Sequence, residues 1–293
     1  MRRKLFIVGC GDIASRALPA LSATFEVSAL ARSPGSAAAL RERGVHAVSG
    51  DLDRPDTLDA AGWHAESLLH CAPPQRTGNT DERTRHLIDA LAAAMVPRRL
   101  VYLSTSGVYG DCGGDWVDES RPLAPQSDRA RRRVDAEQCL EAFCNERNVK
   151  LTILRVPGIY AADRLPVERL KRGTVALRAE DDVFTNHIHA EDLAAIVVRA
   201  LEDDAPTGVF NASDDSALRM ADYFDLVADR FGLARPPRVP RAEALARLSP
   251  EMASFMAESR RLVNRRLKEV LGVKLAYPSV FEGVPKMDAT VAG

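Results

Sequence analysis

The sequence lacks several features that would assign it to a specialised class of protein. Its 293 residues carry 40 Lys or Arg against 41 Asp or Glu, so there is no excess of positive charge for a nucleic-acid backbone. No run approaches the ~18 consecutive apolar residues of a membrane span. No long low-complexity tract is present, and 46% of the residues are hydrophobic, which excludes general disorder. We expect a folded protein that binds neither nucleic acid nor membrane.

The few cysteines also exclude two classes of site. None has the C-x-x-C spacing of a zinc or redox motif, so no metal site is expected. The five are an odd number, so they cannot all pair within one chain: Cys10, Cys71, Cys112, Cys139 and Cys144. The apolar run near the start meets Asp12 and Arg16 too early for the ~7–15-residue core of a signal peptide. We therefore expect a reduced protein in the cytoplasm.

Short apolar runs alternate with helical stretches in the first half of the chain. This alternation predicts βαβ units and a parallel sheet. The predicted strands are residues 4–8, 26–30, 46–49, 67–71, 100–104 and 151–156. The predicted helices are residues 12–23, 36–43 and 81–95, and a long helix capped by Ser127 that runs to about Arg147. The predicted fold class is α/β, a Rossmann-like doubly wound parallel sheet.

Beyond residue 158 this alternation stops. Two short strands, at 183–184 and 209–210, are mixed with helices predicted over 191–203, 221–231, 241–247 and 259–270. We expect residues 1–158, with parts of 183–212, to form the nucleotide domain. Residues 159–182 and 213–293 would form a small C-terminal α/β lobe for the substrate, with the ligand between the two. The basic helix expected at 259–270 has one apolar face, which favours a surface helix over one that binds DNA or membrane.

A glycine-rich turn follows the first predicted strand. Residues 9–14 have the pattern G-x-G-x-x-A. The first glycine permits a tight turn, the second lets the backbone approach a pyrophosphate, and a small third residue lets helix and strand pack closely. The helix amino end then offers unpaired N–H groups and a positive dipole to phosphate. The predicted cofactor-binding residues of this turn are Gly9, Cys10, Gly11, Asp12 and Ile13.

The end of the second strand favours NADP(H) over NAD(H). An acidic residue there would bind the ribose 2′-hydroxyl, whereas an arginine can pair with a 2′-phosphate. This chain has Arg32 and Ser33 at that place and no carboxylate. The alternative is that Arg32 is an ordinary exposed loop residue and that NAD is bound.

Several segments together resemble the extended short-chain dehydrogenases/reductases, the family that contains nucleotide-sugar epimerases and dehydratases. The segments span most of the chain in the family's order: 50–52 (GDL), 101–111 (VYLSTSGVYGD), 154–160 (LRVPGIY), 187–193 (HIHAEDL) and 208–211 (GVFN). The tighter glycine motif places the chain with an atypical subgroup. The resemblance implies that Asp51 and Leu52 contact adenine. Many relatives pair through two helices of the nucleotide domain, so the resemblance also implies a homodimer.

The resemblance also implies positions for the cofactor riboses and for catalysis. The loop with Ala72, Pro73 and Pro74 lies where the family lines the riboses, although two prolines in such a loop need no ligand. Counting back from the Val-Tyr-Gly triplet, the family's catalytic Ser/Thr falls on Thr105.

The family's Tyr-x-x-x-Lys pair is absent. Alignment of the following residues puts Arg129 at the tyrosine and Arg133 at the lysine. Arginine cannot exchange a proton near neutral pH, so Arg133 could only bind an anion or hold a ribose hydroxyl. With Arg131 and Arg132 these residues form a basic cluster. It would either recognise a phosphate, a carboxylate or the cofactor's charge, or form a solvated helix face.

Other residues could replace the missing acid/base. Tyr109 and Tyr160 lie just beyond the fifth and sixth strands, and His187 and His189 could titrate near neutrality. Each also has a plain structural interpretation, as a packed aromatic or a ring bonded to backbone.

Two hypotheses for the function follow. The first is an NADP(H)-dependent oxidoreductase or epimerase for a small polar carbonyl or sugar-derived substrate, with Thr105, Tyr109 and Arg133 in the site. The second is a non-catalytic NADP(H)-binding sensor or partner module.

Overall fold

The computed structural model describes residues 2–59, 63, 65–93, 96–247, 253 and 256–286. Its centre is a seven-stranded sheet in the order β12-β7-β5-β4-β1-β2-β3, in which every neighbouring pair is parallel. The strands are β1 (Arg3–Val8), β2 (Phe25–Ala31), β3 (His46–Ser49), β4 (Ser67–His70), β5 (Arg99–Thr105), β7 (Lys150–Val156) and β12 (Gly208–Asn211). All six strands predicted for the first half are present, and the short run near 209–210 is the seventh.

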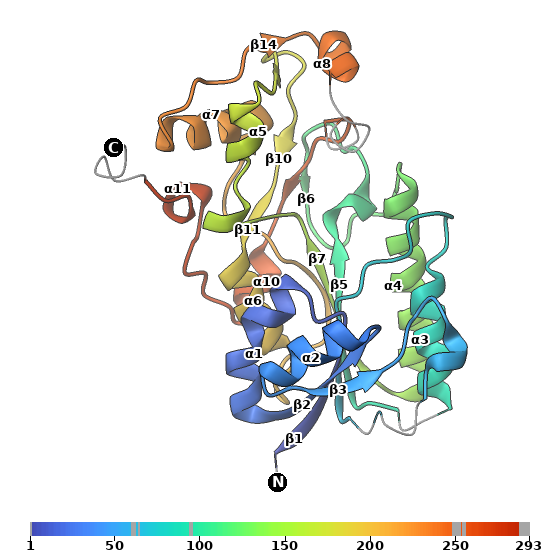
Figure 1. Cartoon of the computed structure of the whole chain (residues 1–293). Helices are drawn as coiled ribbons and strands as arrows, with labels where there is room; N and C mark the ends of the chain where they lie inside the picture. The colour runs from blue at the N-terminus through green and yellow to red at the C-terminus, as the bar shows by residue number, and fades with distance from the viewer. Residues whose placement is uncertain are drawn as a thin grey trace.

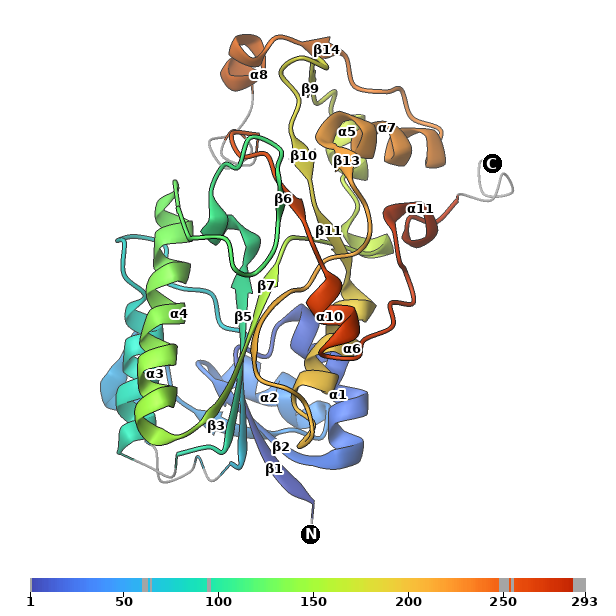
Figure 2. The ribbon, with the colours of Figure 1, turned by 180° about the vertical axis from the view of Figure 1, so that it is seen from behind.

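Helices cover both faces of the sheet, as a doubly wound fold requires (Figures 1 and 2). One face carries α1 (Asp12–Thr24), α2 (Pro34–Glu42) and α6 (Ala190–Ala200), and the other carries α3 (Glu82–Ala92) and α4 (Asp128–Arg147). The predicted Ser127 cap is confirmed, because its side chain accepts a hydrogen bond from the Ala130 N–H. Residues 94–95 of the predicted third helix lie outside the described residues.

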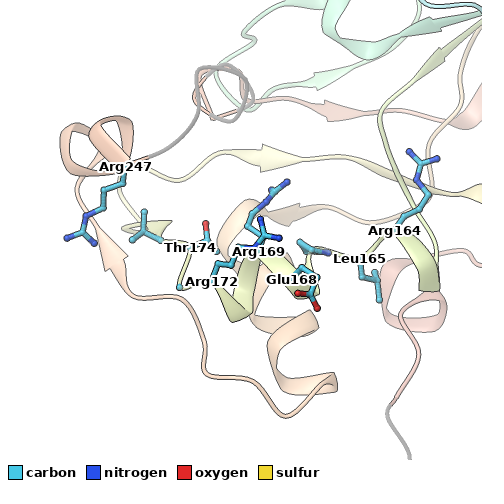
Figure 3. A pocket seen from close by; sticks show the side chains of 10 residues that line it. Arg164, Leu165, Glu168, Arg169, Arg172, Thr174 and Arg247 are labelled. Atoms are coloured by element: carbon cyan, nitrogen blue, oxygen red, sulfur yellow. The ribbon is translucent and has the colours of Figure 1, made fainter.

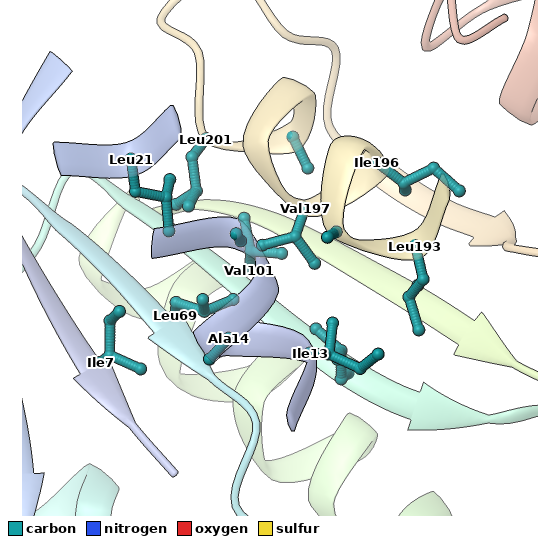
Figure 4. Close-up of a cluster of buried hydrophobic side chains, with 14 of the residues drawn as sticks. Ile7, Ile13, Ala14, Leu21, Leu69, Val101, Leu193, Ile196, Val197 and Leu201 are labelled. Atoms are coloured by element: carbon teal, nitrogen blue, oxygen red, sulfur yellow. The ribbon is translucent and has the colours of Figure 1, made fainter. Parts of the chain in front are cut away.

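The strands are apolar throughout because both faces are buried. Leu5 and Ile7 point into the core beneath α1 and α6, whereas Phe6 and Val8 point into the core beneath α3 and α4. Figure 4 shows the first of these cores, in which Ile7 and Val197 lie among the aliphatic side chains between the sheet and its helices. This two-sided burial holds the sheet rigid, so the loops at its carboxyl edge are fixed in position.

A smaller lobe lies beyond the carboxyl edge of the sheet (Figure 1). Its helices are α5 (Val167–Lys171), α7 (Met220–Arg230), α8 (Arg241–Arg247) and α11 (Val280–Gly283), and its short strands are β9 (Ala176–Leu177), β10 (Phe184–Thr185), β13 (Leu218–Arg219) and β14 (Arg238–Val239). The lobe has its own apolar core, which includes Leu177, Phe224 and Val280. The predicted helices near 191–203, 221–231 and 241–247 correspond to α6, α7 and α8.

The predicted helix over 259–270 is wrong. Residues Arg261–Leu262 form β15, which pairs in parallel with β6 (Trp116–Val117), and only α10 (Arg265–Glu269) is helical. The Asn186 side chain accepts a hydrogen bond from the Leu262 N–H and so holds the strand against the lobe. The spacing of the apolar residues favours a helix here. Backbone pairing with the distant strand β6 buries Leu262 in a strand instead, so the helix is not needed for its burial.

Short elements connect the sheet to the lobe. The strands β8 (Gly158–Tyr160) and β11 (His187–His189) pair in parallel just above the main sheet. The described residues also include the single-turn 3₁₀ helices η1 (Pro55–Thr57), η3 (Ser106–Tyr109) and η4 (Ala162–Arg164).

Candidate functional site

The glycine turn after β1 has the geometry that its sequence predicts. Gly9 has φ +88°, and a Cβ there would lie 2.4 Å from the Ala72 backbone nitrogen, so both conformation and space require glycine. The Gly11 N–H donates to the Gly9 carbonyl at 2.8 Å and closes the turn. A Cβ on Gly11 would meet no atom within 4 Å. The backbone of Gly11 therefore faces open space at the amino end of α1.

That space is a cavity of about 680 Å³ at the carboxyl ends of β1 to β4. It lies where the strand order reverses between β1 and β4, the usual ligand position in such sheets. The predicted cofactor residues that line it are Gly9, Cys10, Gly11, Asp12, Arg32, Asp51, Leu52, Ala72 and Pro73. The cavity thus reaches from the glycine turn across the strand ends to Arg32 and Asp51.

Three predicted cofactor residues do not line this cavity. Ile13 is buried in the core between α1 and the sheet. Ser33 accepts a hydrogen bond from the Ser36 N–H and caps α2. Pro74 lines the neighbouring cleft instead. Ile13 and Ser33 therefore support the site through the ends of α1 and α2.

The charges around the cavity favour an anionic ligand at its β2 end. Arg32 is exposed at the end of β2, and Arg43 reaches the same cavity from α2, where it donates to the Ser15 hydroxyl at 2.6 Å. At the glycine turn Asp12 is paired with Arg16 at 2.9 Å and with Arg164 at 2.5 Å. Hydrogen bonds from these two arginines outweigh the effect of partial burial and lower the pKa of Asp12. Its charge is thus offset beside the expected pyrophosphate.

A second cleft, of about 890 Å³, continues from the first. Pro73 lines both, and Pro74 leads into the second, so the two form one path along the carboxyl edge. One wall is the end of β5, with Thr105 half-buried and its hydroxyl accepting the Gly107 N–H at 3.3 Å. The lobe forms the opposite wall through residues of β10 and the segment before β15. Thr105 therefore lies in the cleft, as its predicted role requires.

Arg133 lies in the same cleft, on α4. It donates to the Tyr102 hydroxyl at 2.8 Å and to the Leu103 carbonyl at 3.0 Å, and its guanidinium lies over the Tyr102 ring. Arg129 lines the cleft one turn earlier on the helix and is exposed. The two positions that the resemblance aligns with the family's Tyr-Lys pair are thus both arginines that line the cleft.

Tyr109 lies outside this cleft. It is 1% exposed, and its hydroxyl donates to the Asn211 side chain at 2.8 Å and accepts from Arg155 at 2.9 Å. Burial raises the pKa of Tyr109 to about 12. Arg155 in turn forms a buried ion pair with Glu137 at 2.7 Å. Tyr109 is therefore not placed to act as an acid/base in the cleft, because its hydroxyl is hydrogen-bonded to Asn211 and Arg155 beneath the site.

Sequence reasoning missed Arg155 and Glu137. A charge within an otherwise apolar strand was the available signal for Arg155, since such a residue must find a buried partner. It also missed Arg76, Asn186 and Arg260, which reach the cleft from three distant segments.

The other candidate acid/bases are buried at the base of the lobe. The Tyr160 hydroxyl donates to the Ser279 carbonyl at 3.1 Å, and burial raises its pKa. His187 stacks on Tyr223 with ring centroids 4.2 Å apart, and burial lowers its pKa to about 3. The His189 ring accepts the Glu191 N–H and caps α6. These three residues do not line the second cleft, so their structural interpretation holds.

A pH effect is expected from Asp214, a carboxyl group in the same buried region. It is 3% exposed, and burial raises its pKa to about 7. The unfolded chain loses this proton near pH 3.9 while the folded protein keeps it, so stability falls as the pH rises from about 4 to 7. D214N should therefore be more stable than the wild type by about 2–4 kcal/mol at pH 8.5 and by only about 1 kcal/mol at pH 4.5. Guanidinium unfolding at both pH values measures this difference; an equal difference at both would contradict it.

A third hollow, of about 590 Å³, lies on the lobe around α5 (Figure 3). Arg169, Arg172 and Arg247 line it together with Glu168, and Arg164 at its end also lines the second cleft. Arg169 and Arg172 are exposed. Their charges are thus in contact with solvent and need no bound partner.

Two structural features are absent from the described part of the chain. Among these residues no group of three or more His, Cys, Asp or Glu could hold a metal ion. Within the same ranges, none of the helices is long and apolar enough to cross a membrane.

The parallel sheet, its glycine turn and the cavity at the strand reversal define a Rossmann-type dinucleotide-binding protein. A family profile described as NAD(P)H-binding matches residues 9–204, and the chain belongs to this family. The fold agrees with the predicted resemblance to epimerases and dehydratases of the extended short-chain type.

Solved structures support the same fold over nearly the whole chain. A conserved protein of unknown function from Silicibacter pomeroyi is 31% identical, with 96% of each chain covered and a TM-score of 0.80. A candidate NAD-dependent epimerase/dehydratase from Methylobacillus flagellatus is 26% identical over 97% of this chain and 96% of that one, with a TM-score of 0.70. The UDP-glucose 4-epimerase of Thermotoga maritima, solved with UDP-glucose, is 18% identical over 96% of each, with a TM-score of 0.77. No curated protein sequence matches.

Proposed function

We propose that the protein is an NADP(H)-dependent oxidoreductase or epimerase that acts on a small polar carbonyl compound or a sugar derivative. The observation that carries this proposal is the continuous path from the glycine turn, past Pro73, to Thr105. A dinucleotide along this path would have its phosphates at Gly11 and its reactive ring toward the second cleft. Relatives solved with NAD or with UDP-glucose have the same fold, which supports the path as a ligand site.

Each residue along the path has a chemical role in this proposal. The N–H groups at the start of α1 hold the pyrophosphate, Arg32 pairs with the 2′-phosphate, and Asp51 and Leu52 contact adenine. Ala72, Pro73 and Pro74 shape the ribose sites. The bound cofactor would accept or donate a hydride. The Thr105 hydroxyl donates to the substrate oxygen, and Arg133 orients the substrate or a ribose.

The proton in this proposal is exchanged with water in the cleft. An arginine side chain is a poor proton donor or acceptor in catalysis, and the Tyr109 hydroxyl lies outside the cleft. The rate should therefore lack the pH dependence that a tyrosine acid/base of lowered pKa would produce.

Calorimetric titration with NADPH and NADH tests the cofactor. We expect R32A to bind NADPH about 10–100-fold more weakly than the wild type, because a charge-assisted contact to phosphate contributes about 1.5–3 kcal/mol. Its affinity for NADH should change less than about threefold. R41A is the matched control, since Arg41 is exposed on α2 and lines neither cavity. Equal losses of NADPH and NADH affinity in R32A would refute the 2′-phosphate assignment.

A second candidate function is a non-catalytic NADP(H) sensor. It is favoured by the fixed positive charges of Arg129 and Arg133 where the family's proton-transferring pair would be. This candidate requires NADPH binding without turnover of carbonyl or sugar-nucleotide compounds, and a partner whose affinity depends on the cofactor. Turnover of NADPH with any such compound by the wild type would exclude it. Reductase activity gained only by R129Y/R133K would favour it.

A further inference from the structure

The second cleft is strongly positive. Six arginines line it, and Glu258 is the one carboxylate among the lining residues. The arginines come from four separate parts of the chain: Arg76, Arg129, Arg132, Arg133, Arg164 and Arg260. Glu258 is already paired with Arg260 at 2.8 Å. Arg164 is likewise paired, with Asp12 at 2.5 Å, so the unbalanced positive charge of the cleft includes Arg132 and Arg133.

Two of these arginines are buried with part of their hydrogen-bonding capacity unused. Arg132 is 6% exposed and donates from Nη1 to the Gly78 carbonyl, and Arg260 is 9% exposed and donates from Nη1 to the Gly110 carbonyl and to Glu258. The Nε atoms of both have no hydrogen-bond partner among the described residues. A buried cation with an unused N–H costs free energy unless another group satisfies it.

Two arginines on α4, Arg132 and Arg133, also lack acidic partners in the described ranges. Neither Arg132 nor Arg133 has a carboxylate within 4 Å, whereas the adjacent Arg131 is paired with Asp128 at 2.7 Å. Figure 2 shows that the amino end of α4, which carries them, lies at the carboxyl edge of the sheet. Arg133 is held there by Tyr102 and Leu103, so its guanidinium is oriented before any ligand arrives.

We infer that the substrate carries a compact oxyanion, a carboxylate or a phosphate, that binds between the α4 arginines and Arg260 on the Thr105 side of the cleft. This inference rests on the proposed function and assigns the charged group of the substrate of that same cleft. Planar guanidinium groups bind carboxylate and phosphate through paired N–H bonds, which suits either oxyanion. The anion supplies the charge that the walls lack and satisfies the buried Nε atoms. The arginines thus select a small anionic substrate at the place where the family has its Tyr-Lys pair.

The experiment titrates the full chain with inorganic phosphate and, separately, with malonate, at constant ionic strength. Each titration is done with and without saturating NADPH, and both the Kd and the thermal midpoint are measured. The wild type should bind at least one of the two anions, and the affinity should persist with NADPH bound. R132M and R133M should bind at least ~10-fold more weakly, because each loses a charge-assisted contact. R131Q, the matched control on the same helix, should stay within about twofold.

The E258Q variant is expected to bind the anion more tightly, a result that loss of folding cannot produce. Removal of the one lining carboxylate frees Arg260 and removes repulsion, so the anion should bind ~3–10-fold more tightly. Binding of phosphate but not malonate would identify a phosphorylated substrate, and the reverse a carboxylate. The inference is overturned if the wild type binds neither anion, if R131Q loses as much affinity as R133M, or if NADPH displaces the anion.

Failure of this inference is separable from failure of the proposed function. Anion binding that depends on Arg132 and Arg133 in a protein that does not bind NADPH would refute the oxidoreductase proposal alone. NADPH binding without any anion binding would refute the anion site alone.

Discussion

The G11V variant is expected to bind NADPH at least ~100-fold more weakly than the wild type. Its side chain would extend into open space where the cavity meets the amino end of α1, and would keep the pyrophosphate from the backbone N–H groups. Several charge-assisted hydrogen bonds of about 1.5–3 kcal/mol each would be lost together. Because Gly11 has an extended backbone, with φ -86°, the valine is tolerated conformationally and stability should fall by only about 1 kcal/mol.

Calorimetry and thermal unfolding separate these two effects. G11A should show a smaller loss of affinity, since one methyl group fills less of the space. A20V is the control on the same helix, because Ala20 is exposed and lines neither cavity. Unchanged NADPH binding in G11V would show that the phosphates bind elsewhere, and a loss of folding in G11V would contradict the open space at this position.

The E137Q variant is expected to lose about 3–5 kcal/mol of stability. The Glu137 side chain is 2% exposed and accepts hydrogen bonds from Arg155 and from the Ser104 hydroxyl. Without the negative charge of Glu137, the guanidinium of Arg155 remains buried and uncompensated beneath the end of β5. For a chain of this length the loss corresponds to a fall in Tm of roughly 10 °C.

Two further variants test the cause of that loss. E137L/R155M replaces the pair by apolar groups and should recover most of the lost stability, because no buried charge remains. E146Q breaks the exposed pair with Arg147 and should cost about 0.5 kcal/mol or less. Chemical unfolding of all four proteins measures these differences. A double variant no more stable than E137Q would mean that the loss comes from packing and not from the unpaired charge.

These variants also test how the candidate site is supported. Arg155 connects Glu137 on α4 to the Tyr109 hydroxyl, and Tyr109 in turn binds Asn211 on β12. Thr105 lies at the end of β5, directly before the 3₁₀ turn that carries Tyr109. We expect the loss of this network to lower activity as well as stability, since Thr105 would lose its fixed position.

Local sequence alone was sufficient for the sheet and the glycine turn. Strands buried on both faces must be apolar throughout, so their short runs are visible without tertiary information. The turn at Gly9 requires a positive φ and space next to Ala72, which only glycine satisfies. The cap at Ser127 depends on a hydrogen bond three residues along the chain. The positive φ at Gly9 and the cap at Ser127 are local effects, and the apolar strands follow from burial of the whole sheet; the close approach of Ala72 to Gly9 is the one long-range cause among them.

The composition of the second cleft was decided by tertiary structure. Residues 261–262 became a strand because the Asn186 side chain and the β6 backbone offered hydrogen-bond partners, although their spacing suits a helix. Tyr109 occupies the place that the resemblance implies, yet Arg155 and Asn211, 46 and 102 residues away, engage its hydroxyl. Such contacts depend on the long-range fold, which no local pattern encodes.

The sequence by itself thus determined the α/β class, the dinucleotide turn and the absence of the Tyr-Lys pair. Only the folded chain brought Arg132, Arg133 and Arg260 around one cleft and put Tyr109 outside it. The physical reason is that backbone conformation and burial act locally, whereas the charge and shape of a cleft are sums over side chains from distant segments. The glycine turn could therefore be predicted from its residues, and the lining of the second cleft could not.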